Sequence, residues 1–399
     1  MIFKSFNIDF FEFRNNILYL HYNFDKKVFF IETIDFNIWE KIKNFNKNTL
    51  DFLFYNILIA NWISYYKLYP FANINLPVNL TEKQLNFWYK FYLNWLGEFF
   101  YKNKINPNVV NLKLWKKELL SLISTEKLEN KSLLLRWGWK DSIVSSQLLK
   151  DTNFDLLVVG KLDNIKLETA KILWKNPILI KRTLDSNLFY LNNQAGFYNW
   201  HVPITWIISF ISLATAYLYW YKNIFTSNEK SASEENLIWK GFKINHQYSK
   251  SIEFEQDFKN YIKDFTNINY KSLLSNLTEL EIAEKFSKYK KFHKAFSSCN
   301  KNFSLTKKST KKWCCNCEKC SFVWLILSAY LEPKEMVDIF GENLFEKKEL
   351  LEIFKWFITK NKKPFECVWT YNESKKAFKL AIKKYEKLPF ILKEIKKYL

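Results

Sequence analysis

Strand-like and helix-like runs alternate between residues 130 and about 295, and this alternation limits the possible folds more than any other feature. Apolar runs predict strands at 132–135, 154–160, 177–181 and 223–226. The segments between them predict helices, the longest of which is the apolar stretch 202–221. Strands joined through helices pair in parallel and carry helices on both faces. The sequence therefore predicts an α/β fold built on a parallel sheet.

The first predicted strand is followed by the turn RWGWKDS, residues 136–142. A strand, a turn and a helix in this order present free backbone N–H groups and the positive end of a helix dipole, which together bind anions. The candidate anion-binding residues are Gly138, Lys140, Asp141 and Ser142. The alternative is an ordinary turn in which Asp141 or Ser142 only caps the helix.

This turn is similar to the SGGxDS loop of the PP-loop ATP pyrophosphatases, and it matches that loop at Gly138, Lys140, Asp141 and Ser142. The resemblance implies an adenine nucleotide alpha hydrolase-like core that binds ATP and Mg²⁺ and releases AMP and pyrophosphate. Trp137 and Trp139 depart from the pattern. We expect this core at residues 126–295, between an N-terminal α+β domain at 1–125 and a helical C-terminal region at 296–399.

Glycine is scarce and tryptophan is abundant. The chain has 6 Gly and 16 Trp in 399 residues, whereas average usage of roughly 7% predicts about 28 glycines. Arginine occurs only three times among 61 basic residues, which is typical of an AT-rich gene. Some AT-rich bacterial lineages read UGA as glycine, and a code that reads UGA as tryptophan would print Trp instead. We therefore hypothesise that many tryptophans stand for glycine, which would relieve the strain of an indole at any loop position with positive φ.

Four cysteines indicate a metal site. Cys314, Cys317 and Cys320 have the spacing Cys-x2-Cys-x2-Cys, and Cys299 lies 15 residues before them. Four thiolates at such spacing can surround a structural zinc ion. The alternative is a set of free or disulfide-bonded thiols, and Cys315 is the substitute ligand if the register differs.

The net charge and the start of the sequence exclude few classes of protein. The formal net charge is +21, but the lysines are spread along the chain, so nucleic-acid binding is not expected and a small polyanionic substrate fits equally well. No secretory signal is visible at the start of the sequence, which predicts a cytoplasmic protein. The stretch 202–221 is nearly uncharged, but Pro203, Thr205 and Ser209 favour a buried helix over a membrane span.

Several longer segments resemble the UDP-N-acetylmuramoyl-L-alanyl-L-glutamate epimerases of bacterial peptidoglycan synthesis: FYNWHVPITW, WCCNCEKCSFVWLIL, IFGENLF, KKPFECVWTYNES and the polar block 228–255. The resemblance covers roughly residues 60–380. It implies ATP- and Mg²⁺-dependent inversion of the terminal L-glutamate of a UDP-muramoyl dipeptide. Glycine is expected in this family pattern at seven tryptophans: Trp62, Trp95, Trp137, Trp139, Trp200, Trp206 and Trp369.

The inversion requires groups that move a proton on each face of a planar intermediate. The candidates are His201, His246 and Cys367, although each is equally compatible with a structural role. The candidate substrate-binding residues are Asn228, Glu229, Lys230, Ser231 and Lys250. Glu229 is also a candidate Mg²⁺ ligand.

Two other functions stay open at this point. A different PP-loop enzyme, such as a tRNA thiolase or a deazaguanine synthase, would share the loop and the cysteine cluster and would bind RNA with a steep salt dependence. A zinc-stapled nucleic-acid binder without enzymatic activity would need no ATP and would tolerate the substitution Asp141→Ala. The polar block favours the epimerase.

Overall fold

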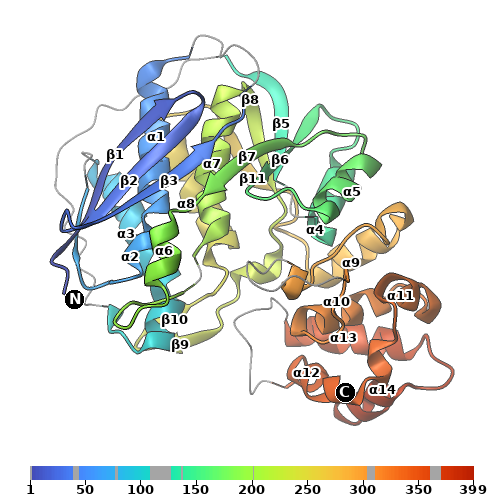
Figure 1. The fold of residues 1–399 in the computed structure, drawn as a ribbon. Helices are drawn as coiled ribbons and strands as arrows, with labels where there is room; N and C mark the ends of the chain where they lie inside the picture. The colour runs from blue at the N-terminus through green and yellow to red at the C-terminus, as the bar shows by residue number, and fades with distance from the viewer. Residues whose placement is uncertain are drawn as a thin grey trace.

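The computed structural model describes residues 2–38, 45–76, 80–107, 127–135, 138–200, 202–302, 311–359 and 370–399. A nine-stranded sheet runs through its larger part in the order β11-β8-β5-β6-β7-β3-β2-β1-β4 (Figure 1). Five neighbouring strands are parallel, as the sequence predicts. They are β5 (Glu129–Leu135), β6 (Phe154–Val159), β7 (Ile178–Thr183), β8 (Tyr221–Thr226) and β11 (Asn269–Ser272).

The predicted strands are confirmed with boundaries that shift by a few residues, and β11 is an additional strand that the sequence did not predict. Helices cover both faces of the parallel strands. In β5, Leu133 and Leu135 belong to the main core, whereas Leu134 faces a smaller core formed with α4 and α5. This alternation follows from the two-residue period of a strand. The helices next to these strands are α4 (Lys140–Leu148), α5 (Asn164–Ile172), α6 (Ser186–Leu191) and α7 (Ile204–Leu218).

The N-terminal strands extend the same sheet. β3 pairs antiparallel with β7, and β2 and β1 follow in antiparallel order, with β4 parallel to β1 at the edge. A buried ion pair joins the two parts, with Arg182 Nε 2.6 Å from Glu32 Oε1. The division at residue 125 stays a prediction. The elements before it are β1 (Ser5–Arg14), β2 (Ile17–Phe24), β3 (Val28–Asp35), α1 (Lys47–Asn61), α2 (Ile63–Tyr66), β4 (Asn73–Asn75) and α3 (Glu82–Asn103).

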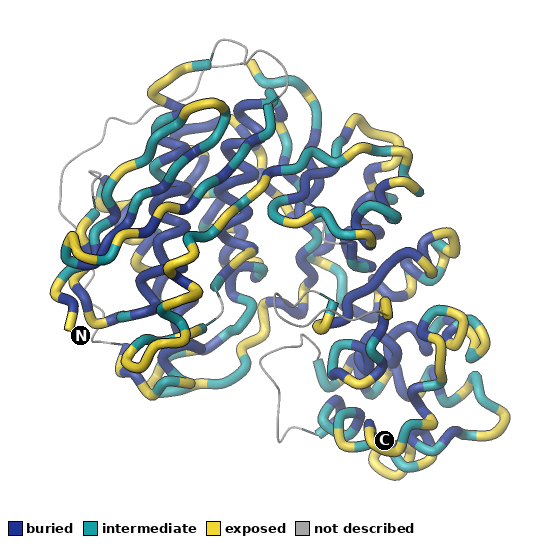
Figure 2. The backbone as a smooth tube through the Cα atoms, in the orientation of Figure 1, coloured by how far each residue is buried: buried dark blue, intermediate teal, exposed yellow. Residues whose placement is uncertain are grey.

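The apolar stretch 202–221 forms α7, which is buried along almost its whole length against α1 and the sheet (Figure 2). Its hydroxyls bond within the protein: Ser209 Oγ donates to Thr205 O at 2.9 Å and lies 2.8 Å from the Tyr270 hydroxyl. Within the described residues, no helix has the length and apolar character needed to cross a membrane. The expectation of a buried helix is confirmed.

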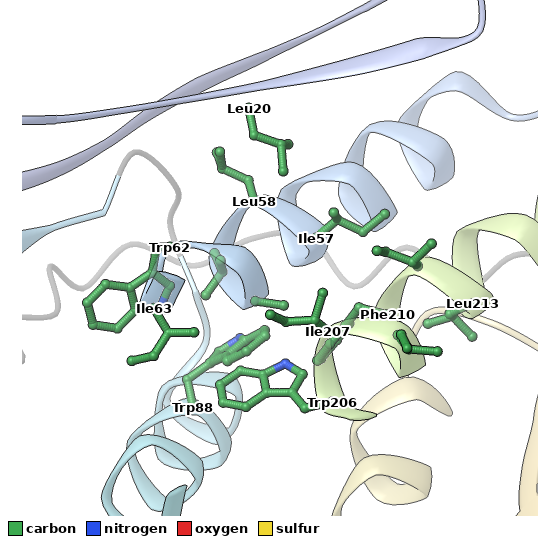
Figure 3. Packing of buried hydrophobic residues seen from close by; sticks show 14 of the residues in the cluster. Leu20, Ile57, Leu58, Trp62, Ile63, Trp88, Trp206, Ile207, Phe210 and Leu213 are labelled. Atoms are coloured by element: carbon green, nitrogen blue, oxygen red, sulfur yellow. The ribbon is translucent and has the colours of Figure 1, made fainter. Parts of the chain in front are cut away.

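The main core is crowded with aromatic rings where α3 meets α7 (Figure 3). Trp88 lies 4.9 Å from Phe210 and 5.5 Å from Trp206, measured between ring centroids. The ring centroids of Trp206 and Phe91 are only 3.2 Å apart, well inside the usual 4.5–7 Å. The indole N–H of Trp206 is buried and has no partner among the described residues. A smaller residue at position 206 would remove both defects, as the glycine hypothesis expects.

Two further tryptophans adopt a backbone conformation that favours glycine. Trp174 has φ 54° and Trp220 has φ 65°, and each directly follows a helix. At Trp174 the bonds Trp174 N to Lys171 O and Lys175 N to Ala170 O complete a Schellman motif, whose left-handed position is usually glycine.

The C-terminal part forms a helical lobe below the sheet (Figure 1). It has its own apolar core, in which Trp324, Phe345 and Phe354 are buried. Along the chain between β8 and β11 lie the hairpin β9 (Leu237–Trp239) and β10 (Phe242–Ile244), the 3-10 turns η2 (Lys230–Ser233) and η3 (Tyr248–Lys250), and α8 (Ile252–Ile262). The lobe contains α9 (Glu279–Ser287), α10 (Glu318–Ser328), α11 (Pro333–Phe340), α12 (Leu351–Trp356), α13 (Tyr371–Ile382) and α14 (Phe390–Ile395).

Candidate active site

The predicted anion-binding turn lies between β5 and α4, in the middle of the parallel strands. Gly138 has φ +81°, and a β-carbon there would lie 2.9 Å from Ile165 Cγ2, so the position requires glycine. Trp139 caps α4 with φ −88°, a value open to any residue. The backbone at position 139 therefore does not favour glycine, and only the size of its indole argues for glycine there. Trp137 lies outside the described residues.

A cavity of about 110 Å³ opens at the carboxyl ends of β5 and β8. From β5 the chain proceeds to β6 and β7 on one side, and it returns to β8 on the other side. Open α/β sheets bind ligands at this point, where the strand order reverses. The lining comes from the turn after β5, the start of α7, the segment after β8, and the elements η3, α9 and α10.

A buried ion cluster forms one wall of this cavity. Lys140 Nζ donates to Asp141 Oδ1 at 2.5 Å and also to Glu279 Oε2. Burial disfavours the charge on Lys140, but the two carboxylates outweigh it and raise the lysine pKa. Burial raises the pKa of Glu279 to about 7, while Lys140 opposes that shift. Glu279 was not predicted from the sequence. The capping box at Thr278 indicates that α9 begins there, but it does not show which part of the protein α9 packs against.

The polar block contributes a second wall. Asn228, Glu229 and Lys250, three of the predicted substrate-binding residues, line the cavity. Lys230 is exposed and does not line it, and Ser231 is buried outside the lining. Burial lowers the pKa of Lys250, and the charge of Lys319 lowers it further, whereas Glu229 opposes the shift.

The candidate acid–base groups have different positions. His246 Nδ1 lies 2.5 Å from Glu98 Oε2, so a buried carboxylate orients the imidazole. His246 itself does not line the cavity, although its neighbour Gln247 does. His201 and Cys367 lie outside the described residues.

The four predicted metal ligands come together at the start of α10. The sulfur atoms of Cys299, Cys314, Cys317 and Cys320 lie within 4.8 Å of one another. Cys320 Sγ is 3.7 Å from Cys314 Sγ and 3.4 Å from Cys317 Sγ, close to the roughly 3.8 Å that a tetrahedron with about 2.3 Å zinc–sulfur bonds requires. The residues present therefore fit a thiolate-bound metal ion.

Cys315 is not part of this cluster. Its thiol donates to Phe340 O at 3.4 Å, and burial raises its pKa to about 12. The alternative register, in which Cys315 replaces one of the four ligands, is therefore wrong. Hydrogen bonds from Cys317 and Cys320 hold the pKa of Cys299 far below its usual value, and the contact with Cys299 raises the pKa of both partner thiols.

Comparison with known proteins assigns the chain to a family. Residues 1–273 match the model of the MurL N-terminal domain, and residues 295–395 match the model of the MurL C-terminal domain. The chain belongs to the MurL family. The N-terminal MurL model thus includes the N-terminal strands and most of the cavity lining, while the C-terminal MurL model includes the cysteine cluster and Lys319 of the lining.

Three relatives share one printed name, UDP-N-acetyl-alpha-D-muramoyl-L-alanyl-L-glutamate epimerase. The relative from Salinispora tropica is 33% identical over 324 residues, which are 80% of this chain and 70% of the relative. The Micromonospora relative is 32% identical, with 80% and 72% covered, and the Xanthomonas oryzae relative is 33% identical, with 72% and 64% covered. No solved structure matches this MurL chain. These names favour the epimerase among the three functions considered from the sequence.

Proposed function

We propose that this chain is an epimerase of peptidoglycan precursor synthesis that inverts the terminal L-glutamate of UDP-N-acetylmuramoyl-L-alanyl-L-glutamate. Membership of the MurL family and the shared name of its relatives support this assignment. The observation that carries the proposal is a cavity shared by two groups of candidate residues. It joins the Asp141–Ser142 turn, where ATP would be split, to Asn228 and Glu229 of the polar block.

The chemistry explains the use of ATP. Removing the α-proton of a carboxylate is difficult, because the carbanion would lie beside a negative charge. In the proposed reaction, an oxygen of the glutamate α-carboxylate attacks the α-phosphorus of ATP and pyrophosphate leaves. The resulting acyl-adenylate carries no charge at the carbonyl, so this group accepts electrons when the α-proton departs. A proton then returns to the opposite face, and water hydrolyses the product to AMP and the free carboxylate.

The residues of the chain have distinct proposed roles. The PP-loop turn, with Gly138, Lys140, Asp141 and Ser142, binds the phosphates. Mg²⁺ is usually held by one or two carboxylates together with phosphates. Asp141 and Glu229 line the same cavity and are the carboxylates that would hold it.

His246 is the acid–base candidate among the described residues; its contact with Glu98 fixes the orientation of the imidazole, although the ring does not line the cavity. His201 and Cys367 stay proposals from the sequence. The cysteine cluster holds zinc as a structural ion, because four thiolates close its coordination sphere.

The test uses the chain with glycine at the seven tryptophan positions where the family pattern expects it. We expect D-glutamate after acid hydrolysis of UDP-muramoyl-L-Ala-L-Glu that has been incubated with protein, ATP and Mg²⁺. In D₂O the product should carry one deuterium at the α-carbon, and AMP should form. The L-Ala-D-Glu substrate should incorporate deuterium in the same way. No D-glutamate and no deuterium exchange would contradict the proposal.

A further inference from the structure

Two lysines from different parts of the chain face the same indole in the cavity. Lys250 Nζ lies 5.3 Å from the centroid of the Trp139 ring, and Lys319 Nζ lies 5.5 Å from it. Lys250 belongs to η3, next to the sheet, whereas Lys319 lies in the first turn of α10 in the C-terminal lobe. The sequence analysis did not identify Lys319 as a binding residue.

These two cations differ from Lys140, which is neutralised by two carboxylates in the same cavity. Among the described residues, neither Lys250 nor Lys319 forms an ion pair, and their nearest recorded partner is the face of the Trp139 indole. A cation over an aromatic ring gains on the order of 1 kcal/mol. This gain is small beside the cost of removing an ammonium group from water. Two such cations on opposite elements therefore form a site for an anion.

The side chain at position 139 occupies the space next to both lysines. This residue ends the turn that follows β5, and its backbone leads directly into the N-terminus of α4. With glycine at position 139, both ammonium groups would face an open volume beside that helix terminus. A polyphosphate can accept hydrogen bonds from both lysines at once.

The cysteine cluster determines where Lys319 lies. Lys319 stands between Cys317 and Cys320, and the Cys317 side chain caps α10 by accepting from the Cys320 N–H at 3.5 Å. A metal ion bound by these cysteines would fix the backbone on both sides of Lys319. The side chain of Lys319 then reaches out of the lobe into the cavity beneath the sheet.

We propose that Lys250 and Lys319 form a clamp for the polyphosphate of the nucleotide at position 139, and that metal in the cysteine cluster sets the anion affinity by fixing Lys319. The identity of the anion rests on the proposed use of ATP. The clamp joins the two parts of the chain, because one lysine comes from the sheet side and the other from the C-terminal lobe.

The test measures pyrophosphate binding by calorimetry with the full chain carrying Trp139→Gly. Lys250→Ala and Lys319→Ala should each weaken binding by about tenfold, the loss expected for one charge-assisted hydrogen bond. Lys319→Arg should retain most of the affinity. Lys334→Ala is the matched control, because Lys334 is an exposed lysine of the same lobe, and it should leave the affinity unchanged. Unchanged affinity in Lys319→Ala, with circular dichroism and metal content intact, would overturn the clamp.

A second arm tests the role of the metal. Removing metal with a chelator should weaken pyrophosphate binding about as much as Lys319→Ala does, and it should cause no further loss in the Lys319→Ala variant. An additional loss in that variant would show that the cluster does not act through Lys319. D-glutamate formation separates the two proposals. If D-glutamate still forms and the Lys319→Ala variant binds pyrophosphate with unchanged affinity, the clamp proposal is refuted and the epimerase proposal is retained. If the chain with glycine at all seven tryptophan positions neither binds pyrophosphate nor forms D-glutamate, both proposals fail.

Discussion

Replacing Trp174 with glycine should stabilise the protein, although the substitution deletes the largest side chain. Trp174 has φ 54° at the left-handed position of a Schellman motif. This conformation costs a residue with a β-carbon roughly 1–2 kcal/mol of folding free energy, which glycine avoids. Glycine in turn loses about 0.5–1 kcal/mol because it is more flexible in the unfolded chain. The Trp174 side chain is 95% exposed, so its removal costs almost no burial. The expected net gain is about 1 kcal/mol.

Trp174→Ala is the matched control, because it removes the indole and keeps the β-carbon. In thermal unfolding followed by circular dichroism, Trp174→Gly should melt roughly 2 °C above Trp174→Ala. The alanine variant should melt close to the parent. A glycine variant that melts at or below the alanine variant would refute the reasoning, and it would also remove the backbone argument for glycine at this position.

Three other predictions test the candidate site. Asp141→Ala should abolish AMP formation in the glycine-substituted chain, whereas Asp151→Ala, at an exposed position, should not; equal AMP release by both would exclude the PP-loop assignment. Elemental analysis should find about one zinc per chain, lost in Cys299→Ser and retained in Cys315→Ser; zinc-free parent protein would contradict the site. Pyrophosphate affinity should fall as pH rises through about 7, because deprotonation of Glu279 adds negative charge to the cavity. Glu279→Gln should show a smaller decrease across this range, and identical pH profiles would exclude Glu279 as the cause.

The parts of the fold that the sequence predicted are those encoded locally. Four of the five parallel strands were found because each is a short apolar run between helices, whereas β11 (NYKS) is not apolar and was missed. The turn at Gly138 was found because its residues are contiguous. β3 pairs with β7, and nothing near β3 in the sequence specifies that partner. Glu279 and Lys319 were missed for the same reason, since only the packing of the lobe against the sheet brings them to the cavity. The spacing of the cysteines predicted the metal site, because four thiolates at this spacing can surround one metal ion and few other arrangements bring them together.

The junction between β3 and β7 has a consequence for how this chain is made. Glu32 and Arg182, which bond across that junction, are 150 residues apart, so the hairpin strands β1 to β3 leave the ribosome long before their partner exists. During that interval the outer edge of β3 offers unpaired N–H and C=O groups, which is the feature that promotes pairing between chains. Neighbouring nascent chains on the same mRNA therefore compete with β7 for pairing to the edge of β3. Slow synthesis of residues 36–177 lengthens the time during which β3 is unpaired. The yield of folded protein should depend on translation speed and on chaperones that cover open strand edges.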